Sequence, residues 1–510
     1  MEKTLVKKSE YLKLKYKFFI NRILIYFSFL LIPLWLQDTE DLNLLVQSGI
    51  LLVYLLFMGG QWYFFGKEID NRLKIYYRAN SSMERIVYRI TLGSIGMILL
   101  FNIFSLFPSV LHQYIFWGFF AIVGLFYSWP TRGKIIEESM ISQFGEMKYM
   151  DSFERTILLL TGFTFIISLP EVQLFQNIDA LKLYLDPSEN VSAFLWNFLS
   201  FIYTPFVSIP KLYNLIWCFH FYFFGLGLFI FSFYCLMRYL FSRRLALLGV
   251  YAIVSTWSFS KILGLDFFST MTTTVSILWL WSLVWSSHSG TYRAGLFTGL
   301  VGSYMAMINP VNFLLVPVGI IISYFFYFKE RTQWFKQQWL KYNILGFAIA
   351  LMIFGFKFES IEFSFFNLYL AESTVLEHLN RKAFFVISPV GLILGLFYLS
   401  GRSRTLLTYV GFDKFKFKQV FYGLIVVILF GVFIQPEFVA GFTFIWILSL
   451  LAVIPIEWVF QTISRLRSKR NIIYAIYILV CLLDSHLENR LRIIGKIFFD
   501  MEILKYFIQL

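Results

Sequence analysis

The sequence predicts an all-α, polytopic membrane protein with about fifteen transmembrane helices, and three observations support this fold class. The 510 residues are 58% hydrophobic and only 15% charged, with a mean hydropathy of +0.70, which is too apolar for a soluble globular protein. The apolar runs last about 15 to 25 residues, as membrane-spanning helices do, whereas barrel strands would be short and alternating. The basic residues also concentrate in alternate loops between these runs.

Each predicted span is an apolar run that charged or turn-forming residues bound at both ends. The first follows a basic N-terminal stretch, and no small-residue cleavage site follows Leu36, so we expect it to be retained as a span. The run Tyr127-Ser-Trp-Pro130 ends the fourth span. The predicted spans cover residues 18–36, 45–65, 90–108, 113–129, 156–170, 213–237, 245–260, 267–285, 294–309, 311–327, 343–357, 384–400, 420–435, 438–459 and 472–484.

The distribution of lysine and arginine predicts the orientation of these spans. If the N-terminus is cytoplasmic, the loops on the cytoplasmic side hold 33 of the 44 basic residues, and the opposite loops before residue 485 hold six. This alternation is what the positive-inside rule describes, and a miscounted helix would have broken it. The net charge of +14 is therefore a topological signal, and we expect no nucleic-acid partner.

Loop lengths divide the chain into three parts. Only two loops on the predicted outer side are long, at residues 171–212 and 358–383. The amphipathic tail at 485–510 is either a third outer element or a sixteenth span. A polar stretch at residues 131–155 separates four N-terminal spans from the rest. We expect a four-span preface with its cytoplasmic linker at 1–155, a central module at 156–383, and C-terminal spans with the tail at 384–510.

The first long outer loop has the pattern of two amphipathic helices. Pro170 and Glu171 suit the first turn of a helix, because proline has no N–H to lose there and a negative charge favours the helix N-terminus. Asp186 precedes a proline, which stops the helix. A second, more apolar helix is expected over about 191–203. Along the first helix the apolar positions recur at helical spacing, at Leu174, Ile178, Leu181 and Leu185.

The order of spans and loops from Thr156 to about Lys382 carries a resemblance to a known family. The region holds one span, the long outer loop, six more spans and the second outer loop. This order is similar to the seven-helix module of the GT-C glycosyltransferase superfamily, whose members move sugars from polyprenyl-phosphate carriers at the outer side of a membrane. The resemblance covers fewer than half of the residues. Its local features begin with a basic inner turn at Arg243 and Arg244 and an acidic residue, Asp266, near an outer turn. A glycine-rich helix with Gly295, Gly299 and Gly302 follows, and then a proline-interrupted one with Asn309, Pro310 and Pro317.

The resemblance implies catalytic residues in the first outer loop. An acidic residue directly after the first helix acts in that superfamily as a base or helps to hold a divalent metal ion, and Glu171 matches this position. A second nearby acidic residue is common there, and Asp179 is the nearest candidate. Here Leu-Pro-Glu replaces the usual Asp-containing pattern, so a non-catalytic relative stays open. Helix geometry places Glu171 and Asp179 about 12 Å apart along one straight helix, too far for both to touch one atom.

The resemblance also implies cations that would bind the carrier phosphate. Lys261, Arg381 and Lys382 are the scarce basic residues on the predicted outer side, although such residues at an interface often only extend towards water. His378 shares the second outer loop with Glu372 and Glu377. His220 lies within a predicted span, where an ionisable group is a functional candidate.

The spacing of the cysteines predicts neither a disulfide framework nor a zinc site, because Cys218, Cys235 and Cys481 all fall inside apolar runs. The segment Lys67 to Asp70 has a faint likeness to UbiA-type prenyltransferases. That family needs two Asp-rich motifs to hold magnesium and diphosphate, and the sequence has neither.

These observations predict a glycosyltransferase of a bacterial inner membrane, with lipid and a lipid-linked sugar as partners. Two alternatives stay open. A transporter or flippase would carry charges in mid-span and broken helices in repeated halves, and the sequence has few such charges and no evident halves. A non-catalytic assembly protein would need no site. The sugar, the acceptor and the oligomeric state do not follow from the sequence.

Overall fold

The protein is described here from a computed structural model, and almost every residue that the structure describes is helical. These residues are 16–17, 19–37, 44–75, 82–104, 106–128, 150–168, 227–255, 267–308, 312–327, 331–354 and 469–484. No strand occurs among them, which confirms the all-α class for this part of the chain. The predicted spans at 384–400, 420–435 and 438–459 lie outside the described residues.

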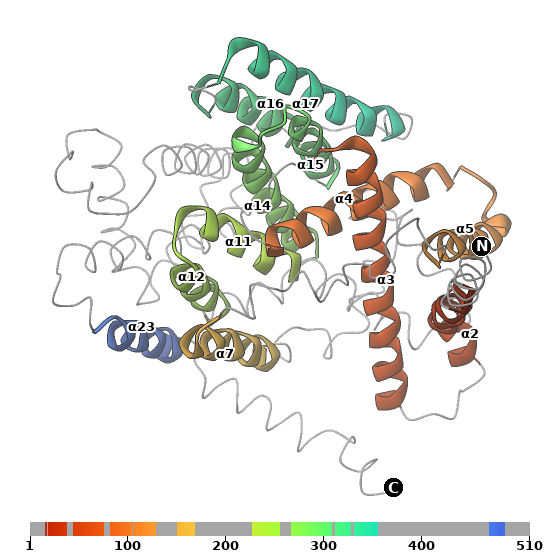
Figure 1. Cartoon of the computed structure of the whole chain (residues 1–510), viewed down its shortest axis with the longest axis horizontal. Coiled ribbons are helices and arrows are strands. Elements are labelled where there is room, and N and C mark those ends of the chain that lie inside the picture. Colours follow the sequence, from red (N-terminus) through yellow and green to blue (C-terminus); the bar gives the residue numbers. More distant parts are fainter. Residues whose placement is uncertain are drawn as a thin grey trace, which may run out of the picture.

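Figure 1 shows the helices in chain order, and each overlaps a predicted span. They differ from the predictions mainly at their ends, because a helix continues into polar residues that an apolar run excludes. Thus the predicted span at 45–65 becomes a helix that ends at Leu73, where Lys74 takes a left-handed φ of 51°. The helices are α2 (Ile32–Gln37), α3 (Leu44–Leu73), α4 (Ser82–Phe104), α5 (Ser109–Ser128), α7 (Ser152–Ser168), α11 (Gly227–Leu240), α12 (Arg243–Ser255), α14 (Phe267–His288), α15 (Ala294–Ile308), α16 (Asn312–Ile322), the π-helical turn η5 (Ser323–Tyr327), α17 (Gln333–Phe354) and α23 (Arg470–Asp484).

Two of the described helices are long and apolar enough to cross a membrane. They comprise Gly49–Leu73 within α3 and Met83–Phe104 within α4. Shorter apolar helices include Phe19–Leu30, Val110–Phe126 and Ala294–Ala306. By length and composition this part of the chain is consistent with association with a membrane.

Helices α3 and α4 cross at a pair of glycines. A Cβ atom on Gly66 would overlap the Arg89 carbonyl, and one on Gly93 would overlap the Trp62 carbonyl. Only residues without a side chain allow two backbones to come this close. Residue numbers rise along α3 as they fall along α4, so the pair is antiparallel.

Helix α15 packs against α14, α16 and α17, with which it lies in the upper part of Figure 1. Gly295 lies against the carbonyl of Trp339, and Gly299 lies against that of Asn343, so α15 and α17 run parallel. Gly302 meets side chains of α14 and α16 instead. The glycines of α15 therefore allow close packing against three neighbouring helices.

The described bundle has some buried polar side chains and some exposed apolar ones. Ser282, Ser286 and Thr298 are fully buried between α14 and α15. On α7, by contrast, Leu159 and Phe163 are 74% and 60% exposed. The exposed apolar side chains of α7 are consistent with association with a membrane, because exposed apolar surface costs free energy in water but not in lipid.

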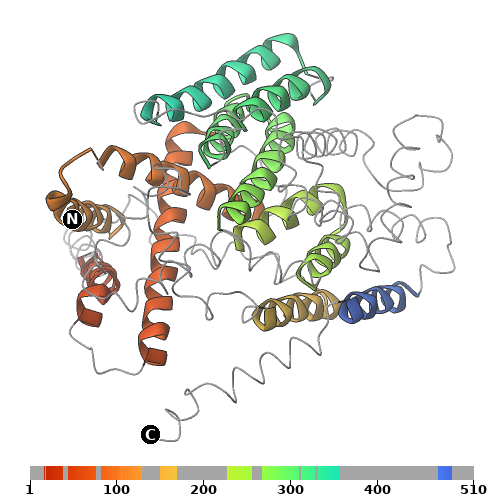
Figure 2. The ribbon, with the colours of Figure 1, turned by 180° about the vertical axis from the view of Figure 1, so that it is seen from behind.

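Helices α7, α12 and α23 form one group of the bundle. Figures 1 and 2 both show α7 beside α12 and close to α23. The rings of Phe153 on α7 and Tyr474 on α23 stack with centroids 5.6 Å apart. Two segments more than 300 residues apart in the sequence are thereby joined near the N-terminal ends of their helices.

Candidate functional site

The site predicted from the sequence lies outside the described residues. This holds for the two acids, Glu171 and Asp179, and for Lys261, His378, Arg381 and Lys382. It also holds for His220, so the expected convergence of acid and cations stays a prediction. Within the part that the structure describes, no three His, Cys, Asp or Glu side chains gather as a metal site would need.

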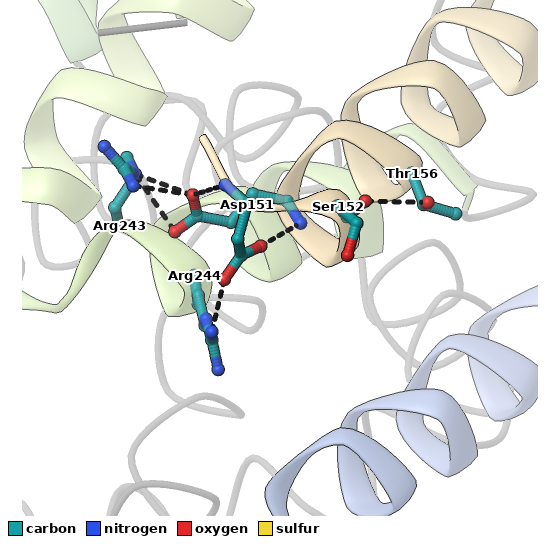
Figure 3. Close-up of polar contacts among 6 residues, drawn as sticks. Asp151, Ser152, Thr156, Arg243 and Arg244 are labelled. Atoms are coloured by element: carbon teal, nitrogen blue, oxygen red, sulfur yellow. Dashed lines mark hydrogen bonds and ion pairs between the residues drawn. The ribbon is translucent and has the colours of Figure 1, made fainter. Parts of the chain in front are cut away.

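An ion-pair cluster joins the first turns of α7 and α12, and sequence analysis did not predict this pairing. Figure 3 shows Asp151 beside Arg244, with Arg243 on the neighbouring side of the same cluster. The fourth member is Glu154, whose side chain is only 4% exposed. We call Asp151, Glu154, Arg243 and Arg244 the four-residue clamp.

The two acids of the clamp cap α7. The backbone N–H of Glu154 donates to Asp151 Oδ1 (2.7 Å), and the backbone N–H of Asp151 donates to Glu154 Oε2 (3.1 Å). This reciprocal pair is a capping box, which satisfies two amide groups that a helix start leaves without partners. The same carboxylates therefore bond to the backbone and to the arginines.

The arginines of the clamp need these acids. Arg243 Nε lies 3.0 Å from both oxygens of Glu154, and its Nη2 lies 2.7 Å from Oε2, a fork that fits a carboxylate. Arg244 Nη2 pairs with Asp151 Oδ2. Because two positive charges in the first turn of α12 oppose the helix dipole, the acids of α7 offset an unfavourable arrangement.

The charge state of Asp151 depends on these contacts. Burial by itself would raise the pKa of Asp151, but the Glu154 amide and the guanidinium groups of Arg244 and Arg243 outweigh it. The pKa of Asp151 is therefore held below its usual range. The carboxyl group is ionised at neutral pH and can serve as a fixed anion, but it is poorly suited to act as a general base.

We expect Asp151→Asn to lower the thermal stability near pH 7 and to matter less as the pH falls. A carboxyl group with a lowered folded-state pKa stabilises the protein above its unfolded pKa of about 3.9, and this contribution is lost as the pH falls through the folded value. Asp151 is 37% exposed, so the effect should be about 1 kcal/mol or less. Unfolding monitored by tryptophan fluorescence at pH 7, 4 and 3 would check this, because the loss is expected below about pH 4. A difference between the two proteins that does not change with pH would contradict it.

A second charged cluster lies almost fully buried between α3 and α4. Arg89 Nε is 3.7 Å from Asp70 Oδ2, with the two side chains 9% and 7% exposed. Tyr88 Oη donates to Asp70 Oδ1 (3.1 Å), and Arg89 Nη1 donates to Tyr63 Oη (2.9 Å). Asp70 therefore serves as the buried counter-ion of Arg89 and as an acceptor for Tyr88.

Tyr88 connects this buried pair to the central module. Its ring lies 5.3 Å from the ring of Trp285 on α14 and 4.7 Å from that of Phe297 on α15, measured between centroids. Aromatic contacts of this geometry add to the free energy of burial. The N-terminal preface is thus packed onto the module through α4.

Three further arginines bond to backbone carbonyls at or just after the C-terminal ends of helices. Guanidinium groups suit this place, because the negative end of the helix dipole and unpaired carbonyls meet there. All three come from loops or helix ends that the sequence places on the cytoplasmic side. Arg293 Nη1 donates to Leu73 O (3.3 Å), Arg331 Nη2 to Ser289 O (3.1 Å), and Arg238 Nη1 to Phe241 O (3.3 Å).

Part of the clamp had a signal in the sequence. Asp151 and Glu154 stand three residues apart before an apolar run, which is the spacing of a capping box. Arg243 and Arg244 were recognised as a basic inner turn. Their partner was not predictable, because 89 residues separate Glu154 from Arg243.

Comparisons of this chain with models of protein families, with curated proteins and with solved structures gave no match.

Proposed function

We propose that this chain is an integral membrane glycosyltransferase that moves a sugar from a polyprenyl-phosphate carrier to an acceptor on the outer side of the membrane. The observation that supports this most is the packing of the central module. Helices α7, α11, α12, α14, α15, α16 and α17 are linked by direct contacts from the first to the last. A seven-span module of the GT-C kind requires such a continuous unit.

The polar bonds at helix ends support the topology within this proposal. The clamp joins loops 132–155 and 238–244, and Arg293 and Arg331 join three further loops. All of these loops were assigned to one side from their basic residues alone. In the proposal this side is the cytoplasm of a bacterial cell, about fifteen helices cross the inner membrane, and the N-terminus is cytoplasmic.

The proposed chemistry belongs to the opposite side. Loops 171–212 and 358–383 follow the C-terminal ends of α7 and α17, whose N-terminal ends lie at the bonded side. Glu171 would accept the proton of the acceptor hydroxyl, with Asp179 as a second acid that helps to orient it or to hold a divalent cation. Lys261, Arg381, Lys382 and His378 would stabilise the departing phosphate.

A transfer assay with the full-length protein tests this proposal. We expect Glu171→Gln to reduce sugar transfer from a labelled polyprenyl-phosphate sugar by about 10²- to 10⁴-fold, because amides are very weak bases. Asp186→Asn is the matched control, since it removes an acid from the same loop at a position whose predicted role is only to end a helix. Both variants should elute as the unaltered protein does in detergent.

Two outcomes would contradict the proposal. One is that the Glu171→Gln variant transfers sugar as fast as the Asp186→Asn variant does. The other is movement of the intact lipid-linked sugar across vesicles with no transfer, which would indicate a flippase.

A further inference from the structure

Helices α14, α15 and α17 lie together in the upper part of Figure 1. Buried hydrogen-bonding side chains line their interface. At the level of Ser286 these groups satisfy one another. Thr298 Oγ1 lies 2.9 Å from Ser286 Oγ and 3.2 Å from the carbonyl oxygen of Ser282. Trp339 Nε1 donates to Ser286 Oγ (3.2 Å). At this level the protein supplies partners for its own buried polar groups.

One turn further along α17, the amide of Asn343 has no such partner. Its side chain is fully buried, and neither Oδ1 nor Nδ2 is hydrogen-bonded to any residue that the structure describes. Asn343 lies on the face of α17 that meets α15, because its own carbonyl lies against Gly299. Trp339, which is four residues earlier on the same face, donates to Ser286. An amide without partners in an apolar interior is strongly unfavourable, because it has lost its bonds to water without gaining others.

A second unpartnered donor lies close by on α14. The ring of Trp279 is inserted between Gly319 of α16 and Gly302 of α15, with Nε1 directed at Gly302, where an added Cβ would be 3.3 Å from it. Trp279 is 1% exposed, and its Nε1 has no hydrogen-bond partner in the described part of the chain. Gly302 and Gly299 are three residues apart on α15, so the two unpartnered groups flank neighbouring positions of one helix.

We propose that ordered water is bound in this interface, with the Asn343 amide and Trp279 Nε1 as its hydrogen-bonding partners. Water is both a donor and an acceptor, so it can satisfy an amide and an indole together, and buried waters typically make about three such bonds. The close backbone approach at Gly299 favours a ligand as small as water. The bound water would extend the polar layer of Ser286, Thr298 and Trp339 towards the middle of α15.

The first test compares two buried asparagines of the same protein. Asn102 is 4% exposed, and its Nδ2 donates to the carbonyl of Ile98 (2.8 Å), so it has a protein partner. We expect Asn343→Leu and Asn102→Leu both to lower the midpoint of thermal unfolding of the full-length protein in detergent, because each removes bonds that are made in the folded state. If Asn343 bound no water, its replacement by leucine would remove an unpaired polar group and raise the midpoint, which would overturn the proposal.

The second test detects the water itself. X-ray pulses split water into hydroxyl radicals. Because ordered water inside a protein is also split, the radicals that form there oxidise the neighbouring side chains even when these are buried. We expect Trp279 to be oxidised faster than Trp285, which is 3% exposed and packs against the rings of Trp281 and Phe297. In Asn343→Leu the rate at Trp279 should fall towards that at Trp285. Equal rates in the unaltered protein would overturn the proposal, and this comparison needs no variant to fold.

Discussion

Gly299→Ala is expected to destabilise the protein by about 1–3 kcal/mol, even though alanine is the better helix former by about 1 kcal/mol. The reason is the contact between α15 and α17, where an added Cβ would overlap the carbonyl of Asn343 and come within 2.9 Å of the Phe347 amide nitrogen. Both groups belong to a backbone, so neither can rotate away as a flexible side chain would. The helices must separate, and the packing between α15 and α17 is lost with them.

The matched control is Gly118→Ala in α5. Gly118 is exposed, and an added Cβ would meet nothing within 4 Å. The same substitution should therefore be neutral or stabilise the protein by up to about 1 kcal/mol. Tryptophan fluorescence on heating the full-length protein in detergent would compare the two variants. Equal midpoints would mean that α15 and α17 are not in backbone contact.

Asp70→Asn is expected to cost about 3–5 kcal/mol, the usual effect of removing one partner from a buried ion pair. The variant keeps an oxygen for Tyr88 Oη but leaves the guanidinium of Arg89 buried without its counter-charge. Because Tyr88 lies against Trp285 and Phe297, a shift of α4 should also loosen the preface from the module. Faster proteolysis in the loops beside α4 would accompany the lower unfolding midpoint.

Two comparisons separate this effect from a general loss of charge. Glu68→Gln removes the partner of Arg72 from the same helix, but that pair is 35% and 69% exposed and should contribute less than about 1 kcal/mol. The double variant Asp70→Leu with Arg89→Met should recover much of the lost stability, because it leaves no uncompensated charge. An Asp70→Asn protein as stable as Glu68→Gln would contradict the buried pair.

Much of the helical framework could be predicted from local features of the sequence. Apolar runs locate α5, α7, α14 and α15 to within about one turn, because burial in lipid or in the bundle needs continuous apolar residues. The spacing of Gly295 and Gly299 predicts close packing, and the structure shows which helix they meet. Helix ends are the weakest part, since α17 begins at Gln333, ten residues before the apolar run at 343–357.

Pairings between distant residues could not be predicted in the same way. Nothing near Arg243 in the sequence indicates that Glu154 is its partner. The buried pair of Asp70 and Arg89 falls in a stretch whose many basic residues predict a loop. Such pairs depend on how helices pack in three dimensions, whereas hydropathy and spacing report only on single helices. The residues expected to carry catalysis, with Glu171 first among them, were predicted from a resemblance and from scarce charges on one side.

The parallel contact of α15 and α17 has a consequence for biosynthesis. Asn343 leaves the ribosome 44 residues after Gly299, which at about 5–20 residues per second means a delay of roughly 2–9 s. During that interval α16 must be made and must reverse direction before the glycine face of α15 can meet its partner. A nascent chain that stalls between these points would present an uncovered small-residue face to other helices, so this stretch is where wrong helix contacts are most readily made during synthesis.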